Sequence, residues 1–458
     1  MALSDRILRN SNPNGNVATA QPSLVVLPQR REAAPAALMD GFRELKTTIQ
    51  QRLLDTIDLA KLESLEPALM TAKLTETIDD LLREQTRLMT DGDRSRLIEE
   101  IKNEIVGLGP LEPLLQDDDI NDILVNGAKQ VYVERRGKLE LTDVKFHDDQ
   151  HLLHIIGRIV SRVGRRVDES VPMVDARLPD GSRVNAIIPP LAIDGPSLSI
   201  RRFGKDPYTM SDLAANGSLT SQMVDFLRMI VIARFNILVV GGTGSGKTTM
   251  LNCLSSFVPA NERIVTIEDS AELRLQQPHV VRLETRTANL EGKGEITQRD
   301  LVKNSLRMRP ERIIVGEVRG AEVIDMLQAM STGHDGSIAT VHANSPREAL
   351  GRLGMMMMLS GVNLPERAMS QQISAAINFL VHVSRLADGT RKVIKISEIT
   401  GMEGDVVMMQ DLFEYVRTGT SPEGKVLGDF RPAGIRSFYT PRLEAAGMRV
   451  DAKLFEAN

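Results

Sequence analysis

The stretch Asn236-Ile-Leu-Val-Val-Gly-Gly-Thr-Gly-Ser-Gly-Lys-Thr-Thr249 decides the fold class of this chain. Its apolar beginning, up to Val240, predicts a short buried strand. Gly241–Thr248 then matches the pattern G-x-x-x-x-G-K-[ST] in full, and a helical pattern follows from Lys247. A strand, a glycine loop and a helix in this order predict a P-loop that holds a nucleoside triphosphate.

The chemistry of this loop follows from its residue types. Glycines let successive backbone N–H groups turn toward phosphate oxygens, and the start of the helix adds partial positive charge. Lys247 is expected to reach the β- and γ-phosphates, and the Thr248 hydroxyl to bind Mg²⁺. The predicted nucleotide-binding residues are Gly241, Gly242, Thr243, Gly244, Ser245, Gly246, Lys247, Thr248 and Thr249. A glycine-rich turn without a ligand is the alternative, and the strand and helix around the loop argue against it.

Apolar strands and amphipathic helices alternate after the loop. Strands are expected at 264–267, 280–283, 312–315 and 337–341, and helices at 298–308 and 321–330. This alternation predicts an α/β domain, with a mostly parallel sheet covered by helices on both faces.

Two of these strands end in acidic residues. Arg312-Ile-Ile-Val-Gly-Glu317 ends where P-loop folds carry a carboxylate that handles metal or water, and Ile267 is followed by Glu268 and Asp269. Either glutamate could hold Mg²⁺ through its water shell or orient the attacking water. The alternatives are an ordinary surface acid for Glu317 and a helix cap for Glu268 and Asp269.

Histidines form two groups. His334 and His342 flank the strand 337–341, and the residues alone favour neither a functional nor a structural role for them. His147, His151 and His154 have helical spacing but no suitably spaced fourth ligand, so a solvated helix face is favoured over a zinc site.

Composition and apolar periodicity divide the remainder of the chain into segments. Residues 1–36 predict a disordered tail, and 37–106 a helical domain with apolar stripes such as Leu45–Ile57 and an N-cap at Asp93. Residues 107–205 predict a small α+β domain, 206–213 a linker, 214–420 the ATPase domain, and 421–458 an extended C-terminal segment with little core. Met355–Met358 is expected to be helix core rather than a binding surface.

Arginines gather near the end of the α+β domain, at Arg177, Arg183, Arg201 and Arg202. One of them could reach the γ-phosphate as an arginine finger does. Surface ion pairs explain such arginines equally well.

Composition limits the function classes. The net charge is −5 and aromatic residues make up 3% with no Trp, which argues against nucleic-acid binding. The single Cys253, the absence of a zinc ribbon and the absence of a long apolar run predict a protein of the reducing cytoplasm without a membrane span. No Asn-Lys-x-Asp motif is present, which favours ATP over GTP.

Four blocks together resemble the secretion and pilus-assembly ATPases of bacterial type II and type IV systems. They are the Walker A loop Gly241–Thr249, the acidic box Thr266–Ser270, the Walker B strand Ile313–Glu317 and the histidine box Thr332–Asn344. Three further stretches resemble the tight-adherence (Flp, type IVc) pilus branch: Gly107-Leu-Gly-Pro-Leu-Glu-Pro-Leu114, Ser199-Ile-Arg-Arg-Phe203 and Gly401-Met-Glu-Gly-Asp405. The tetracysteine module of type II export ATPases is absent.

The resemblance implies a hexamer of two-domain subunits, in which a RecA-like C-terminal domain binds ATP and the preceding domain supplies arginines. Glu317 matches the Walker B acid, Glu268 and Asp269 the acidic box, and His342 the γ-phosphate sensor of the family. Arg183 and Arg201 are the nearest matches to the family's arginines. It also implies inner-membrane pilus platform proteins as partners.

The leading hypothesis is therefore an ATP-driven motor that assembles, and could also retract, a tight-adherence pilus at the inner membrane. A type IV secretion ATPase that drives protein or DNA transfer is the alternative. A nucleic-acid translocase on a RecA-like core and a nucleotide-gated interaction module without turnover are further alternatives.

Overall fold

The computed structural model describes residues 45–46, 48–49, 52–53, 56, 66–84, 89–135, 137–202, 208–286, 288 and 293–456. The predicted tail 1–36 and the predicted domain end at 205 lie outside these residues. The chain separates into two compact units, Met1–Gly109 and Pro110–Asn458. The predicted boundaries of the helical, α+β and ATPase domains stay predictions.

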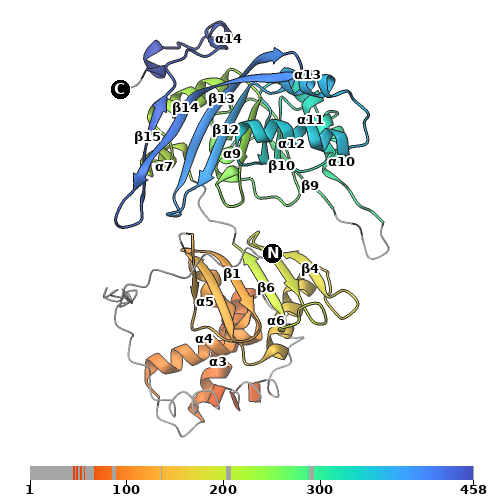
Figure 1. Cartoon of the computed structure of the whole chain (residues 1–458). Helices are drawn as coiled ribbons and strands as arrows, with labels where there is room; N and C mark the ends of the chain where they lie inside the picture. The colour runs from red at the N-terminus through yellow and green to blue at the C-terminus, as the bar shows by residue number, and fades with distance from the viewer. Residues whose placement is uncertain are drawn as a thin grey trace, which may run out of the picture. The chain divides into compact units, whose positions relative to one another are not determined.

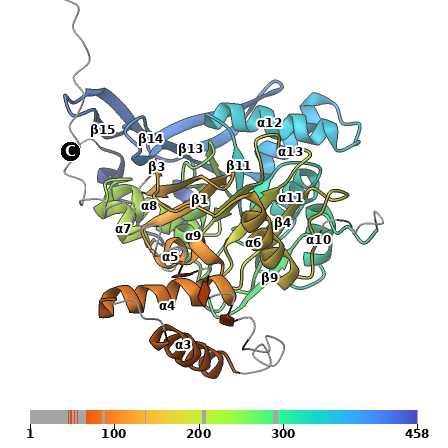
Figure 2. The same ribbon diagram turned by 90° about the horizontal axis from the view of Figure 1, so that it is seen from below.

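In the first unit, α3 (Pro67–Arg83) and α4 (Asp91–Ile105) lie side by side (Figure 2). They share a small apolar core whose buried members are Leu45, Ile49, Leu53, Leu74, Ile78, Leu81, Leu82, Leu97 and Ile101. An ion pair of 2.6 Å between Arg94 Nε and Asp79 Oδ1 joins them at the surface. The predicted N-cap at Asp93 is wrong: Thr90 caps α4, because its side chain accepts the Asp93 N–H.

The second unit begins with a six-stranded antiparallel sheet in the order β3-β2-β1-β6-β5-β4. Its elements are η1 (Gly109–Leu111), α5 (Glu112–Gln116), β1 (Ile120–Asn126), β2 (Gln130–Arg135), β3 (Lys138–Leu141), α6 (Asp149–Arg162), β4 (Met173–Arg177), β5 (Arg183–Ile187) and β6 (Ser197–Arg201). Asp148 caps α6 by accepting the His151 N–H, and the apolar stripe of this helix is buried. Strand β4 is an element that the sequence pattern did not predict.

The rest of the unit is built on a nine-stranded sheet in the order β15-β14-β13-β12-β7-β11-β10-β8-β9 (Figure 1). Its strands are β7 (Ile237–Gly241), β8 (Ile264–Glu268), β9 (Val280–Glu284), β10 (Arg312–Val318), β11 (Ile338–His342), β12 (Phe379–Arg385), β13 (Arg391–Glu403), β14 (Val406–Thr420) and β15 (Val426–Pro432). Pairing is parallel from β12 to β9 and antiparallel from β12 to β15. The predicted α/β fold, with a mostly parallel sheet preceded by a small α+β part, is therefore confirmed.

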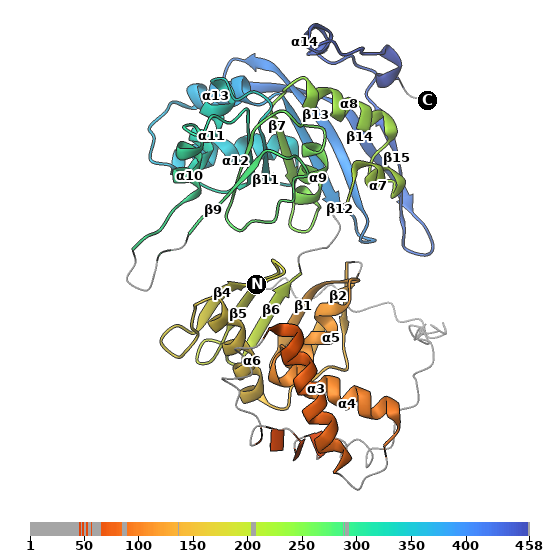
Figure 3. The same cartoon turned by 180° about the vertical axis from the view of Figure 1, so that it is seen from behind.

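Helices cover both faces of this sheet (Figures 1 and 3). The helices of this part are α7 (Met210–Ala215), α8 (Ser221–Ile232), α9 (Lys247–Ser255), α10 (Gln298–Ser305), α11 (Glu322–Ser331), α12 (Pro346–Leu359), α13 (Glu366–Ala376) and α14 (Thr440–Ala445). Side chains of α8 and α9 pack into one core with Val239 of β7, whereas α11, α12 and α13 pack into the other with Val240. Helix α7 begins inside the predicted linker, because Thr209 and Asp212 form a capping box there.

The C-terminal segment corrects one expectation. It was predicted to have little core, yet β15 pairs with β14, and Leu443, Val450 and Phe455 are buried in the same core as β7. Glu398 is fully buried, and it accepts hydrogen bonds from the Ser437 hydroxyl at 2.5 Å and the Phe438 N–H at 2.7 Å. Buried aromatic and aliphatic side chains therefore fix this segment to the domain.

Met355–Met358 is only half core. Met356 and Met357 are buried, whereas Met355 and Met358 are more than half exposed.

In the described part of the chain, no helix combines the length and apolar content that crossing a membrane requires.

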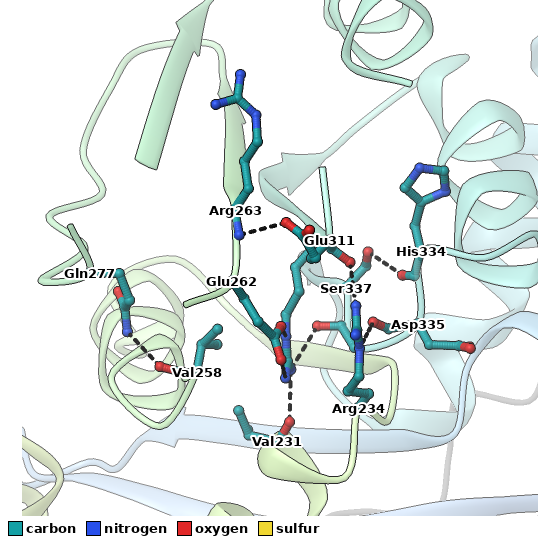
Figure 4. Close-up of polar contacts among 12 residues, drawn as sticks. Val231, Arg234, Val258, Glu262, Arg263, Gln277, Glu311, His334, Asp335 and Ser337 are labelled. Carbon is teal, nitrogen blue, oxygen red and sulfur yellow. Dashed lines mark hydrogen bonds and ion pairs between the residues drawn. The ribbon is translucent and has the colours of Figure 1, made fainter. Parts of the chain in front are cut away.

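A polar network closes the amino-terminal edge of the central strands (Figure 4). Arg312, at the start of β10, is fully buried and bonds Glu262 twice, at 2.5 and 3.2 Å. Its Nη1 also donates to the Val231 carbonyl at 2.7 Å, so this guanidinium joins α8 to the edge of β10. Arg234 donates to the Glu311 carbonyl beside it.

Removing one partner of this buried pair should destabilise the fold strongly. Glu262→Ala leaves the Arg312 charge uncompensated, and we expect a loss of about 3–5 kcal/mol in the free energy of unfolding. The double variant Glu262→Leu/Arg312→Met should recover most of this loss, because well-packed apolar groups can replace a buried ion pair.

Urea unfolding followed by circular dichroism measures both effects. Arg436→Gln is the control, because Arg436 forms an exposed pair with Glu444 at 2.8 Å and should change stability little. A Glu262→Ala protein as stable as this control would contradict the importance of the buried pair.

Candidate nucleotide-binding site

Parallel pairing places the ends of the central strands at one edge of the sheet. Gly241 at the end of β7 lies opposite His342 at the end of β11, and Val341 lies opposite Val318 at the end of β10. Strand β8 pairs with β10 on the far side and ends at Glu268. The P-loop, both predicted acidic groups and His342 therefore meet at the carboxyl edge, where open α/β sheets bind their ligands.

The P-loop contains a left-handed backbone conformation that glycine permits. Gly246 precedes α9 with φ of +97°, a left-handed conformation that favours glycine. The Gly242 carbonyl accepts hydrogen bonds from Lys247 Nζ at 2.9 Å and from the Ser245 hydroxyl at 2.8 Å. The lysine side chain is thus held inside the loop by a backbone oxygen.

Charged side chains from several parts of the chain act on the pKa of Lys247. Burial lowers the pKa of Lys247, Glu317 opposes this effect, and Arg319 adds to it. The ammonium, the Walker B acid and a further arginine therefore interact with one another electrostatically.

The β12–β13 hairpin, which lies outside the four sequence blocks, also contacts the P-loop. Val383 of β12 lies so close to Gly241 that a Cβ atom there would collide with the Val383 carbonyl. Arg391, the first residue of β13, donates from Nε to the Gly244 carbonyl at 2.9 Å. Arg385 lies opposite Arg391 in the β12–β13 register. The hairpin thus holds the outer side of the P-loop.

The side chain of Glu268, the last residue of β8, is buried. Its side chain accepts the backbone N–H groups of Glu272 at 2.6 Å and Leu273 at 2.9 Å through Oε2. Its Oε1 is buried without a hydrogen-bond partner among the described residues. Burial raises the pKa of Glu268, and the two N–H bonds oppose this. This geometry lets Glu268 shape the loop after β8 and leaves one oxygen free for a water.

Glu317 and Asp269 meet on one guanidinium. Arg319 Nη2 lies 2.6 Å from Glu317 Oε2, and its Nη1 lies 3.6 Å from Asp269 Oδ2. Burial raises the pKa of Asp269, and Arg319 opposes that effect. Glu317 keeps 23% of its side chain exposed, so a ligand or a water can reach it.

The two histidines of the histidine box lie at opposite ends of β11. His342 ends the strand beside Gly241, whereas His334 precedes it at the amino edge, where its carbonyl accepts the Ser337 hydroxyl at 2.7 Å (Figure 4). Asn344 bonds Glu348 at the start of α12. Only His342 lies at the P-loop edge.

The predicted arginines separate into two groups. Arg183 bonds Glu272 in the loop that Glu268 anchors, and Arg177, its cross-strand partner, bonds Ser270 at 2.8 Å and Glu284 at 3.0 Å. Arg201 instead pairs with Asp122 at 3.1 Å in its own sheet. Arg202 bonds the Ile120 carbonyl and is also internal to that sheet.

Two contributors were missed by the sequence reasoning. Arg319 comes two residues after Glu317, and its position just past a strand that ends in an acid was a usable signal. Arg391 lies far from the P-loop in the chain, and only the β12–β13 pairing brings it there, so no local pattern could have found it.

A family profile described as "Type II/IV secretion system protein" matches residues 104–416, well over half of the 458 residues. The chain belongs to this family. As a type II/IV secretion ATPase it binds and hydrolyses nucleoside triphosphate, and the family forms hexamers.

Curated relatives agree with this family. A Mycobacterium tuberculosis protein named as a conjugal transfer protein is 41% identical over 312 residues, which cover 67% of this chain and 88% of that protein. The type IV secretion system protein VirB11 of Brucella suis is 32% identical over 320 residues, covering 64% of this chain and 88% of VirB11.

Solved structures of the family are also similar. The crystal structure of the Brucella suis VirB11 ATPase with sulphate is 31% identical, covers 63% of this chain and 91% of that chain, and has a TM-score of 0.35. The Legionella pneumophila ATPase DotB is 21% identical, covers 63% of this chain and 79% of that chain, and has a TM-score of 0.45.

The contact between Arg391 and the P-loop can be tested by mutation. Arg391→Ala removes a charged donor from the Gly244 carbonyl, so the loop should lose order and bind ADP and ATP analogues about tenfold more weakly, since such a bond contributes about 1.5 kcal/mol or more. Isothermal titration measures both affinities. Arg417→Ala, an exposed arginine of β14, is the control, and equal affinities in the two variants would contradict the supporting role of Arg391.

Proposed function

We propose that this ATPase is the motor of a bacterial type IV secretion machine, and that it drives transfer of protein or DNA at the inner membrane. The names of the Mycobacterium tuberculosis and Brucella suis relatives support transfer over the pilus assembly that the sequence blocks favoured. The observation that carries the enzymatic part is the meeting of the P-loop with Glu317 and Asp269 at one sheet edge. We further propose a hexamer on the cytoplasmic side, working against membrane-embedded platform proteins.

In the proposed cycle, the P-loop N–H groups and Lys247 hold the β- and γ-phosphates of ATP. Glu317 orients and deprotonates the attacking water. The 3% exposure of Glu268 and its two backbone bonds support a shaping role for that acid instead. His342, beside Gly241, contacts the γ-phosphate side.

The residues present fit a Mg²⁺ ion bound with the nucleotide. Hard oxygen ligands suit Mg²⁺, which keeps several waters when it binds phosphates. The Thr248 hydroxyl would be a direct ligand, and the unpartnered Oε1 of Glu268 or the Glu317 carboxylate would hold its waters. The ion would neutralise charge on the β- and γ-phosphates.

Arginines from the α+β part complete the proposed site. Arg183 is supported by its contact with Glu272, which lies in the acidic-box loop. The ion pair of Arg201 with Asp122 argues against Arg201 unless that pair opens. Movement of the α+β part against the ATPase part would carry the mechanical output.

Pilus assembly by a tight-adherence system is the second candidate. It is supported by the stretches around Gly107–Leu114, Ser199–Phe203 and Gly401–Asp405. A nucleic-acid translocase has less support, because the net charge is −5 and stacking aromatics are scarce.

Two substitutions separate binding from chemistry. Lys247→Ala should abolish detectable nucleotide binding and hydrolysis, since it removes the phosphate-binding cation. Glu317→Gln should bind ATP with Mg²⁺ but hydrolyse it about 10²- to 10⁴-fold more slowly, because the base is lost. Phosphate release and titration calorimetry measure the two quantities.

Arg436→Gln serves again as control and should retain wild-type turnover. Wild-type turnover in Lys247→Ala would refute the site. To separate the two machines, a gene deletion is complemented, and both transfer to recipient cells and surface filaments are scored. Loss of filaments with normal transfer would favour the second candidate.

A further inference from the structure

Arg319 has a position that the roles above do not use. It follows β10 directly, and its guanidinium lies between the carboxylates that end two neighbouring parallel strands, Glu317 of β10 and Asp269 after β8. With 60% of the side chain exposed, it is free to change partners. The 2.6 Å contact occupies one oxygen of the acid that must act on water.

The backbone under this side chain is fixed. Glu322 Oε1 accepts the N–H groups of Arg319 at 2.6 Å and of Gly320 at 2.8 Å, and Glu322 is itself 7% exposed. The start of α11 therefore holds the turn from which the guanidinium extends. With its backbone held in this way, the Arg319 side chain can change partners without movement of the turn.

Charge balance favours an exchange when ATP arrives. Glu317 raises the pKa of Lys247 and Arg319 lowers it, so the three groups share one electrostatic environment. A triphosphate bound by Lys247 brings concentrated negative charge to this environment, and it competes with Glu317 for the guanidinium. Arginine binds phosphate as well as carboxylate through its planar fork.

We propose that Arg319 is a further catalytic residue, which leaves Glu317 when ATP binds and donates to the γ-phosphoryl oxygens in the same subunit. This inference rests on the proposed role of Glu317. The exchange frees the Glu317 carboxylate, so that the acid becomes available only when a γ-phosphate is present. Without nucleotide the acid stays paired.

In the resulting step, the water oxygen bonds to the γ-phosphorus while the bond from that phosphorus to the bridging oxygen of ADP breaks. The water proton passes to Glu317 and then to the released phosphate. Arg319 stabilises charge on the equatorial oxygens, as arginines do in other phosphoryl transfers.

The test compares two nucleotides. In Arg319→Gln, a non-hydrolysable ATP analogue should bind at least tenfold more weakly, whereas ADP, which lacks the γ-phosphate, should bind within about twofold of wild type. Turnover should fall about 10³-fold or more. Arg319→Lys should restore part of the analogue affinity. The matched control is Arg436→Gln, whose arginine has 58% side-chain exposure and a carboxylate partner at 2.8 Å.

A double-mutant cycle tests the exchange itself. Glu317→Gln weakens the pair that ATP must displace, so the analogue should bind more tightly than in wild type. This gain should vanish in Arg319→Gln/Glu317→Gln. Equal gains with and without Arg319 would mean that the glutamate acts on the nucleotide alone, and would overturn the exchange.

Other outcomes also decide. Equal weakening of ADP and analogue in Arg319→Gln, or unchanged analogue affinity, would reduce Arg319 to a structural partner of Glu317 and reject the inference. A wild-type protein that neither binds nor hydrolyses ATP would instead reject the proposed function. Thermal unfolding of each variant checks that the fold is intact.

Discussion

Parallel hydrogen bonding between β7, β11, β10 and β8 is the constraint on which the rest of this molecule depends. It brings the ends of four strands, distant in sequence, to one edge. Lys247, Glu317, Asp269, His342 and Arg319 project from that edge or from a turn that follows it, whereas Arg183 comes from the six-stranded sheet. The opposite edge carries the buried Arg312–Glu262 pair, which secures the other ends of the same strands.

The two edges divide the work of the sheet. At the amino edge, a fully buried arginine satisfies carbonyls and a carboxylate, which gives a closed and static network. At the carboxyl edge, Arg319 and Glu317 are partly exposed, and Lys247 rests on its own loop. The contacts at the amino edge are therefore buried, whereas those at the carboxyl edge stay open to a ligand.

Local patterns predicted the elements that a short window encodes. The strand ending at Gly241, the P-loop, and the acids after β8 and β10 are adjacent in sequence to the features that define them, so they were found. Residues brought by long-range pairing were not, Arg391 being the example. Arg201 was placed in the site by a motif, but a cross-strand acid at Asp122 takes its guanidinium. Thr90 rather than Asp93 caps α4, because Thr90 directly precedes the first turn of the helix and its side chain accepts the Asp93 N–H.

The burial of Leu443, Val450 and Phe455 against the same core as β7 has a consequence for biosynthesis. A nascent chain that has just emerged with its phosphate loop still lacks part of the surface on which β7 packs. The ATPase core can therefore mature only after synthesis has reached Phe455, and domains generally fold as such whole units. Incompletely made copies would therefore expose apolar surface.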